Sequence, residues 1–216
     1  MFPLYDSPYT SKTPIITWLL ILANIWVFWL ELQGGAQFVT TYALTPAHIS
    51  QLNWRTWYPF VSSMFLHGGW FHLFANMWFL RIFGDNVEAA FGKVRFLLFY
   101  LLAGIAAAFV QYTFATSSSI PMLGASGAIA GVLGAYLVLF PSARITSFVF
   151  IIFYITVIDI PAWFYLPYWF LLQLFSGIGQ INAGTLATSG GVAFLAHATG
   201  FVVGFLSANL FGRRRY

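Results

Sequence analysis

Long apolar stretches alternate with shorter, more polar segments along the chain. The longer stretches have about the length at which a helix crosses the hydrocarbon core of a bilayer. They predict six transmembrane helices, at roughly 14–32, 70–83, 96–114, 126–140, 162–175 and 192–211. Runs of this length do not fit a membrane β-barrel, whose strands are short and alternate in polarity. We therefore expect an all-α, polytopic membrane protein.

The segments between these runs differ in character. Residues 33–69 form a long first loop rich in tryptophan and tyrosine, which predicts a position at the membrane interface. Residues 85–95 predict a short charged turn, and residues 148–161 a connection along the interface. The glycine-rich stretch 176–191 predicts a mobile loop. Together with the aromatic fifth span, this loop is a candidate lid and side gate.

Composition narrows the class of protein further. Of 216 residues, 60% are hydrophobic and 6% are charged, against about 25% charged in soluble domains. A single helical bundle accounts for all 216 residues, so residues 1–216 are expected to form one membrane domain. The chain has no cysteine, which excludes disulfides, thiol catalysis and thiolate metal sites.

The basic residues predict the orientation in the membrane. With six spans, eight of the nine fall on one side, and only Arg55 falls on the other. An excess of Lys and Arg marks cytoplasmic loops, so both termini are expected in the cytoplasm. The net charge of +4 is scattered over the ends of apolar runs, so no nucleic-acid partner is expected.

A serine between two glycines opens the fourth predicted span, in Gly124-Ala125-Ser126-Gly127. Gly124 permits an unusual backbone conformation at the start of the helix. The N–H of Ser126 lies in the first helical turn, where donors have no intrahelical acceptor and an anion is favoured. This arrangement is typical of a nucleophile beside an oxyanion site. Small residues in a membrane helix also serve close packing alone.

The predicted base for this serine is His197. Residues 126–140 span about 22 Å of helix, less than a core of about 30 Å, so Ser126 starts below the outer surface. His197 lies at a matching depth in the sixth span. Gly127 and Gly200 belong to small-residue pairs that would let the two helices approach closely. The alternative is that His197 makes only a packing hydrogen bond.

Two further polar residues share one face of the second span, His72 and Asn76. Together with the Ser126 N–H they could hold a developing oxyanion, or they could simply join helices. His67 is expected to form structural hydrogen bonds nearby. A metal site is not expected, because His67 and His72 are five residues apart and no acidic residue is expected beside them. Asp159 is placed too far away to complete a triad.

Three segments resemble the signatures of the rhomboid intramembrane serine proteases. They are residues 65–76 (FLHGGWFHLFAN), 124–127 (GASG) and 196–204 (AHATGFVVG). The resemblance covers all six spans and implies a minimal, prokaryotic-type rhomboid bundle. One departure is that Trp54-Arg55 lies further upstream of the second-span histidines than is usual in the family. That departure leaves a structural role for Arg55 in doubt.

The resemblance implies a serine endopeptidase that cleaves single-span membrane proteins within the bilayer. Ser126 matches the nucleophile and His197 the base. His72 and Asn76 match the oxyanion donors, and Glu88 a structural acid. No cofactor or metal is implied, and the expected location is a prokaryotic plasma membrane. The alternatives are an inactive rhomboid-like protein that binds membrane clients, and a small transporter, which would be expected to show an internal repeat.

Overall fold

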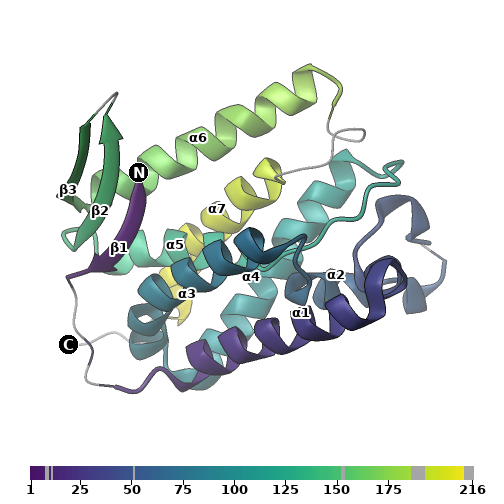
Figure 1. Ribbon diagram of the computed structural model, residues 1–216, viewed down its shortest axis with the longest axis horizontal. Coiled ribbons are helices and arrows are strands. Elements are labelled where there is room, and N and C mark those ends of the chain that lie inside the picture. Colours follow the sequence, from purple (N-terminus) through teal and green to yellow (C-terminus); the bar gives the residue numbers. More distant parts are fainter. Residues whose placement is uncertain (8–9, 11, 51, 152–153, 186–192, 212–216) are drawn as a thin grey trace.

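A computed structural model describes residues 1–216 except 8–9, 11, 51, 152–153, 186–192 and 212–216. Six long helices form a bundle (Figure 1): α1 (Ile15–Tyr42), α3 (Trp70–Phe91), α4 (Lys93–Phe114), α5 (Ser126–Leu139), α6 (Ala162–Asn182) and α7 (Phe194–Phe211). The segment between α1 and α3 contains the short helices η1 (Pro46–His48), η2 (Trp54–Thr56), α2 (Pro59–Ser62) and η3 (Ser63–Phe65). The predicted helical membrane bundle is confirmed.

Three of these helices are long and apolar enough to cross a membrane, among the residues described. They are α1, α4 and α7, while α5 is apolar but shorter, with 14 residues. α5 lies at the centre of the bundle, and every residue from 128 to 136 is buried. A helix that is apolar on all sides is stable only when neighbours surround it, and here α3, α4, α6 and α7 do so.

Several helices extend further than their apolar runs predicted. α1 continues to Tyr42 through a break at Gly35, whose φ of 57° only glycine adopts readily. α3 continues to Phe91, so the predicted charged turn at 85–95 is wrong: Gly92 alone, with φ 84°, separates α3 from α4. α6 contains Pro167 and includes residues 176–182 of the predicted mobile loop. Residues 186–191 of that loop lie outside the described residues.

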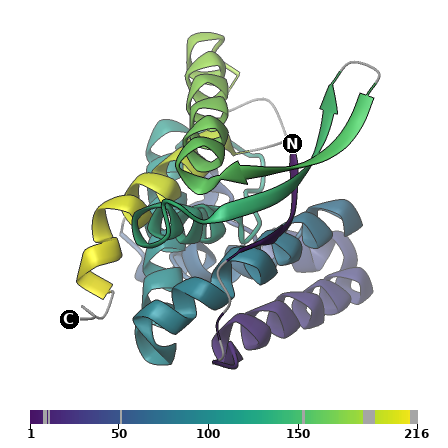
Figure 2. The same cartoon turned by 90° about the vertical axis from the view of Figure 1, so that its left-hand side faces the viewer.

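A small sheet at one end of the bundle was not anticipated. Strands β1 (Phe2–Asp6), β2 (Arg144–Ile151) and β3 (Tyr154–Pro161) pair antiparallel in that order. The segment predicted as an interfacial connection is therefore a hairpin, and it projects beyond the helices (Figure 2). Its exposed residues include Phe150 and Ile155. Alternating β-branched residues favour the strand form here, although the composition is as apolar as that of a helix.

β1 is fastened to the helices through Asp6. Its carboxylate accepts hydrogen bonds from the Tyr136 hydroxyl of α5, at 2.5 Å, and from the Asn86 amide of α3, at 3.0 Å. Burial, and to a lesser extent the neighbouring Asp85, raise the pKa of Asp6 from 3.8 to about 6. The N-terminal strand is thus joined to both α3 and α5 by one ionisable group.

A second carboxylate joins α1 to α3. Glu88 accepts hydrogen bonds from the backbone N–H groups of Ile16 and Thr17, at 3.0 and 2.8 Å, and from the Thr17 hydroxyl at 2.9 Å. These donors lie in the first turn of α1, which has no intrahelical acceptors for them. The negative charge also favours the positive end of the helix dipole. Glu88 therefore has the structural role expected, although within α3 rather than after it.

The closest helix contact joins α5 to α7 through glycines. A Cβ placed on Gly200 would lie 2.0 Å from the carbonyl oxygen of Gly127. One placed on Gly204 would lie 1.9 Å from that of Gly131, and one on Gly134 would lie 2.0 Å from that of Phe201. Each of these positions meets backbone, which cannot move aside as a flexible side chain can. Only glycine fits, as the small-residue pattern predicted.

We predict that Gly204→Ala separates α5 from α7 and lowers the free energy of unfolding by about 1–3 kcal/mol, the usual cost of overpacking. Thermal unfolding in detergent is the measurement. The matched control is Gly179→Ala in α6, where an added Cβ has no atom within 4 Å. The control should melt at or slightly above the wild-type temperature. A Gly204→Ala protein that melts at the wild-type temperature would contradict the assignment.

We also predict a pH-dependent stability from Asp6. Its pKa is raised on folding, so the folded protein holds more protons than the unfolded chain between about pH 4 and pH 6. The stabilisation is complete below the unfolded pKa and is lost as the pH rises through about 6. The melting temperature of the wild type, minus that of Asp6→Asn, should therefore fall between about pH 4.5 and pH 7. A difference that stays constant over this range would refute the prediction.

Candidate active site

Ser126 is the first residue of α5, at the end of a loop with a fixed path. Gly124 has φ 123°, a conformation that side chains disfavour, and its N–H donates to the Ser63 carbonyl at 2.9 Å. The loop is also held by paired backbone hydrogen bonds between Leu44 and Met122, at 3.0 and 2.8 Å. These contacts place Ser126 partly buried inside the bundle, where its Oγ faces α7.

His197 lies one turn into α7 and faces Ser126. The distance from His197 Nε2 to Ser126 Oγ is 2.7 Å, a short hydrogen bond. The start of α7 is held by Gln111 of α4, whose side-chain oxygen accepts from the Ala196 N–H at 3.1 Å. Ser126 and His197 are 71 positions apart in the chain, and the glycine contact between α5 and α7 lets their side chains meet.

A residue that the sequence analysis did not consider completes this arrangement. The Gln173 side-chain oxygen lies 2.9 Å from His197 Nδ1. One helical turn earlier, the Trp169 ring stacks on the His197 ring, with centroids 6.0 Å apart and planes 27° apart. The sequence analysis excluded Asp159 as a third member but did not identify this contact from α6. A lone amide inside an apolar run was the available signal.

His72 of α3 lies against the loop before α5. A Cβ on Gly124 would lie 2.9 Å from His72 Nε2, so the ring lies directly against this glycine. The Gly68 N–H donates to His72 Nδ1 at 3.3 Å. Because Nδ1 accepts, the neutral ring carries its proton on Nε2. That N–H is the group that lies beside the Ser126 loop.

Asn76 lies one turn further along α3 and is buried. Its side-chain nitrogen has no hydrogen-bond partner among the described residues. Buried donors are normally paired, and an exception needs an explanation. A donor that becomes paired only when a reacting group arrives is one such explanation.

His67 is fully buried and packs edge-on against His72, with ring centroids 5.2 Å apart. The expected structural hydrogen bond comes from its backbone: the His67 N–H donates to the Glu31 carboxylate at 3.0 Å. Neither ring nitrogen of His67 has a partner among the described residues. The expectation that no acidic residue lies beside these histidines is wrong, because Glu31 of α1 reaches the loop that carries His67. In the described part of the chain, no three His, Cys, Asp or Glu side chains are grouped as metal ligands.

A small cavity of about 40 Å³ opens beside the serine. It is lined by parts of η3, α4, the 122–124 loop, α5 and the start of α7, with Ser126, Gly124 and Gly127 among its walls. A space of this size holds a water molecule. The site therefore combines a hydroxyl paired with an imidazole and a small cavity that reaches Ser126, and the Asn76 nitrogen in α3 has no partner among the described residues.

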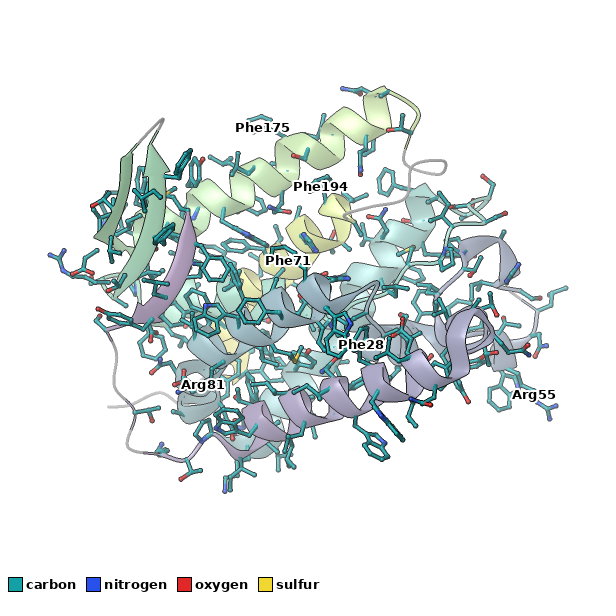
Figure 3. The ribbon with its side chains drawn as sticks, in the orientation of Figure 1. Phe28, Arg55, Phe71, Arg81, Phe175 and Phe194 are labelled. Atoms are coloured by element: carbon teal, nitrogen blue, oxygen red, sulfur yellow. The ribbon has the colours of Figure 1, made fainter. Side chains whose placement is uncertain are left out.

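Other polar residues considered in the sequence lie apart from this group. Arg55 is exposed at the edge of the molecule and points away from the bundle (Figure 3). Its guanidinium contacts the neighbouring Trp54 ring, at 5.9 Å from the ring centroid. Asp159 belongs to β3 and accepts a hydrogen bond from the Thr146 hydroxyl at 2.6 Å.

The known proteins to which this chain is similar include several rhomboid or rhomboid-like proteins. The chain is 37% identical over 131 residues to rhomboid protease GluP of Bacillus subtilis, which is 60% of this chain and 25% of that protein. It is 33% identical over 109 residues to the chloroplastic rhomboid-like protein 11 of Arabidopsis thaliana, 49% of this chain and 39% of the relative. It is also 39% identical over 89 residues to the human mitochondrial presenilin-associated rhomboid-like protein. That alignment covers 40% of this chain and 24% of the relative.

These alignments span less than half of each relative's own length. The family assignment has a broader basis, because the model of the rhomboid domain matches residues 54–214. That range contains α3 to α7, Ser126, His197 and the residues around them. The apolar helices agree with an integral membrane location. The chain belongs to the rhomboid family.

Proposed function

We propose that this protein is an intramembrane serine endopeptidase that cleaves the transmembrane segments of single-span membrane proteins. The observation that carries the proposal is the 2.7 Å hydrogen bond between Ser126 Oγ and His197 Nε2. A hydroxyl paired with a base that is itself oriented by a third group is the recurring signature of serine nucleophiles. The relative GluP is named a rhomboid protease, which agrees with this chemistry.

The mechanism follows from the geometry. His197 Nε2 removes the proton from the Ser126 hydroxyl as Oγ attacks the scissile carbonyl carbon. The imidazolium then returns that proton to the leaving amine, and the C–N bond breaks to give an acyl-enzyme. Water, activated by His197, hydrolyses the ester and releases Ser126. The cavity beside Ser126 provides room for this water.

The negative charge of the tetrahedral intermediate requires donors that are already in place. The proposed donors are the Ser126 N–H at the start of α5, His72 Nε2–H and the Asn76 amide. His72 has the required tautomer because Gly68 donates to Nδ1. The Asn76 side-chain nitrogen has no hydrogen-bond partner among the described residues, so it can bind the oxyanion without breaking another bond to them. Donors that need no reorganisation contribute most to rate.

Residues 1–216 form, in this proposal, one rhomboid-type domain with six membrane spans. With six spans, eight of the nine basic residues would fall on the same side as both termini, and this excess of Lys and Arg supports a cytoplasmic position for that side. The dyad then lies toward the outer side, and a prokaryotic plasma membrane is the proposed location. An inactive rhomboid-like protein that binds clients is the alternative. The pairing of Ser126 with His197 favours the protease.

We predict that Ser126→Ala and His197→Ala each reduce cleavage of a transmembrane model substrate by several orders of magnitude, because each removes an essential member of one unit. The assay uses purified protein in detergent and gel analysis of the products. Melting temperatures should stay near the wild-type value, which shows that the fold is intact. Cleavage by either variant within about tenfold of the wild type would exclude the dyad.

We predict partial losses for His72→Ala and Asn76→Ala, on the order of 10²–10³ in kcat for each oxyanion donor removed. Turnover at saturating substrate is the measurement. The control is Asn24→Ala in α1, another buried amide, whose side chain donates to the Leu20 carbonyl at 2.7 Å within its own helix. If His72→Ala and Asn76→Ala lowered protein yield but kept the wild-type kcat, their role would be to join helices.

A further inference from the structure

The His197 ring is held from both sides by residues of two different helices. Ser126 of α5 bonds Nε2 at 2.7 Å, and Gln173 of α6 lies 2.9 Å from Nδ1. Building on the proposed protease function, we infer that Gln173 is the positioning residue of the general base. The catalytic unit is then a Ser–His pair with a neutral amide as its third member.

The chemical argument concerns the tautomer of the imidazole. A neutral histidine carries one ring proton, and only the form protonated on Nδ1 leaves Nε2 free to accept the serine proton. The Gln173 side chain presents its oxygen to Nδ1. An oxygen can only accept, so in this orientation of the Gln173 amide the contact favours the Nδ1–H tautomer. It also stabilises the imidazolium that forms when Ser126 is deprotonated, because both ring N–H groups then have acceptors.

A neutral amide suits this position better than a carboxylate does in an apolar surrounding. An isolated charge inside a membrane protein carries a large desolvation cost, whereas an amide oxygen does not. Gln173 is partly buried among apolar residues of α6. The chain therefore supplies an acceptor for His197 without placing a second charge within the bundle.

Position on the helix links this role to α6 as a whole. Trp169, four residues before Gln173, stacks on the same imidazole, so one face of α6 provides both the hydrogen bond and the ring contact. Phe170, which follows Trp169 in the chain, stacks on Phe201 of α7 with ring centroids 4.9 Å apart. Phe175 is exposed to the outside of the bundle, on the outer surface of α6 (Figure 3). His197 is consequently oriented only while this face of α6 lies against α7.

The decisive comparison is between two replacements of similar length. Gln173→Glu keeps an oxygen acceptor, whereas Gln173→Met keeps the shape and flexibility but removes the acceptor. A positioning role predicts that Met lowers kcat by about 10- to 100-fold with KM little changed, a part of the 10²–10⁴ that a general base contributes. Glu should stay within about fivefold of the wild type. A packing role predicts the opposite order, because Met is the better apolar replacement.

Gln180→Met is the matched control, because it makes the same chemical change on the same helix seven residues away. It should keep the wild-type kcat. If Gln173→Met does not fold, Gln173→Asn serves instead, since its shorter side chain withdraws the acceptor and the same loss is expected. Equal kcat values for the wild type and for the folded Met or Asn variant would overturn the inference.

A second measurement reports the tautomer without using activity. Nitrogen NMR of the histidine-labelled protein, with His197 assigned from His197→Ala, should show a proton on Nδ1 in the wild type and a mixture of tautomers in Gln173→Met. An unchanged His197 tautomer would overturn the inference even if kcat fell.

Ser126→Ala separates the two proposals: if this variant cleaves like the wild type, the protease proposal fails. If Ser126→Ala is inactive but Gln173→Met is fully active, only the role of Gln173 fails.

Discussion

The backbone contact between α5 and α7 is the constraint on which the site depends. Packed helices usually have axes 8–10 Å apart, and a serine and a histidine side chain can meet only when their helices are close. Glycines 127, 131 and 134 of α5, with 200 and 204 of α7, allow carbonyl groups of one helix to lie against the Cα positions of the other. The hydrogen bond between Ser126 and His197 forms at the end of this contact where α5 and α7 begin.

Buried or partly buried carboxylates join the other elements of the bundle to one another. Glu88 accepts from the free N–H groups of α1, Glu31 from the His67 N–H, and Asp6 joins β1 to α3 and α5. Each carboxylate satisfies donors that would otherwise be unpaired and costly in an apolar surrounding. Glu31 thereby fixes the loop before α3, and the backbone bonds between Leu44 and Met122 fix the loop before Ser126. Such fixed positions are the preorganisation that the proposed oxyanion stabilisation requires.

Hydropathy and three short motifs were sufficient to predict the helical bundle and the residues proposed for the site. They were not sufficient for the hairpin of β2 and β3, because a membrane-proximal strand is as apolar as a membrane helix. The junction of α3 and α4 was missed because one glycine with positive φ replaces a whole turn. Gln173 was missed because its partner lies on a helix 24 residues away in the chain, a pairing that no local pattern encodes.

The central claim is that His197 activates Ser126 as a nucleophile, and covalent trapping tests it most directly. Purified protein would be treated with a fluorophosphonate, which modifies activated serines, and the adduct would be located by peptide mass spectrometry. The account predicts one adduct per chain, on Ser126, and no adduct in folded His197→Ala, although Ser126 is still present. Modification of a different serine, or equal modification of Ser126 in His197→Ala, would contradict it.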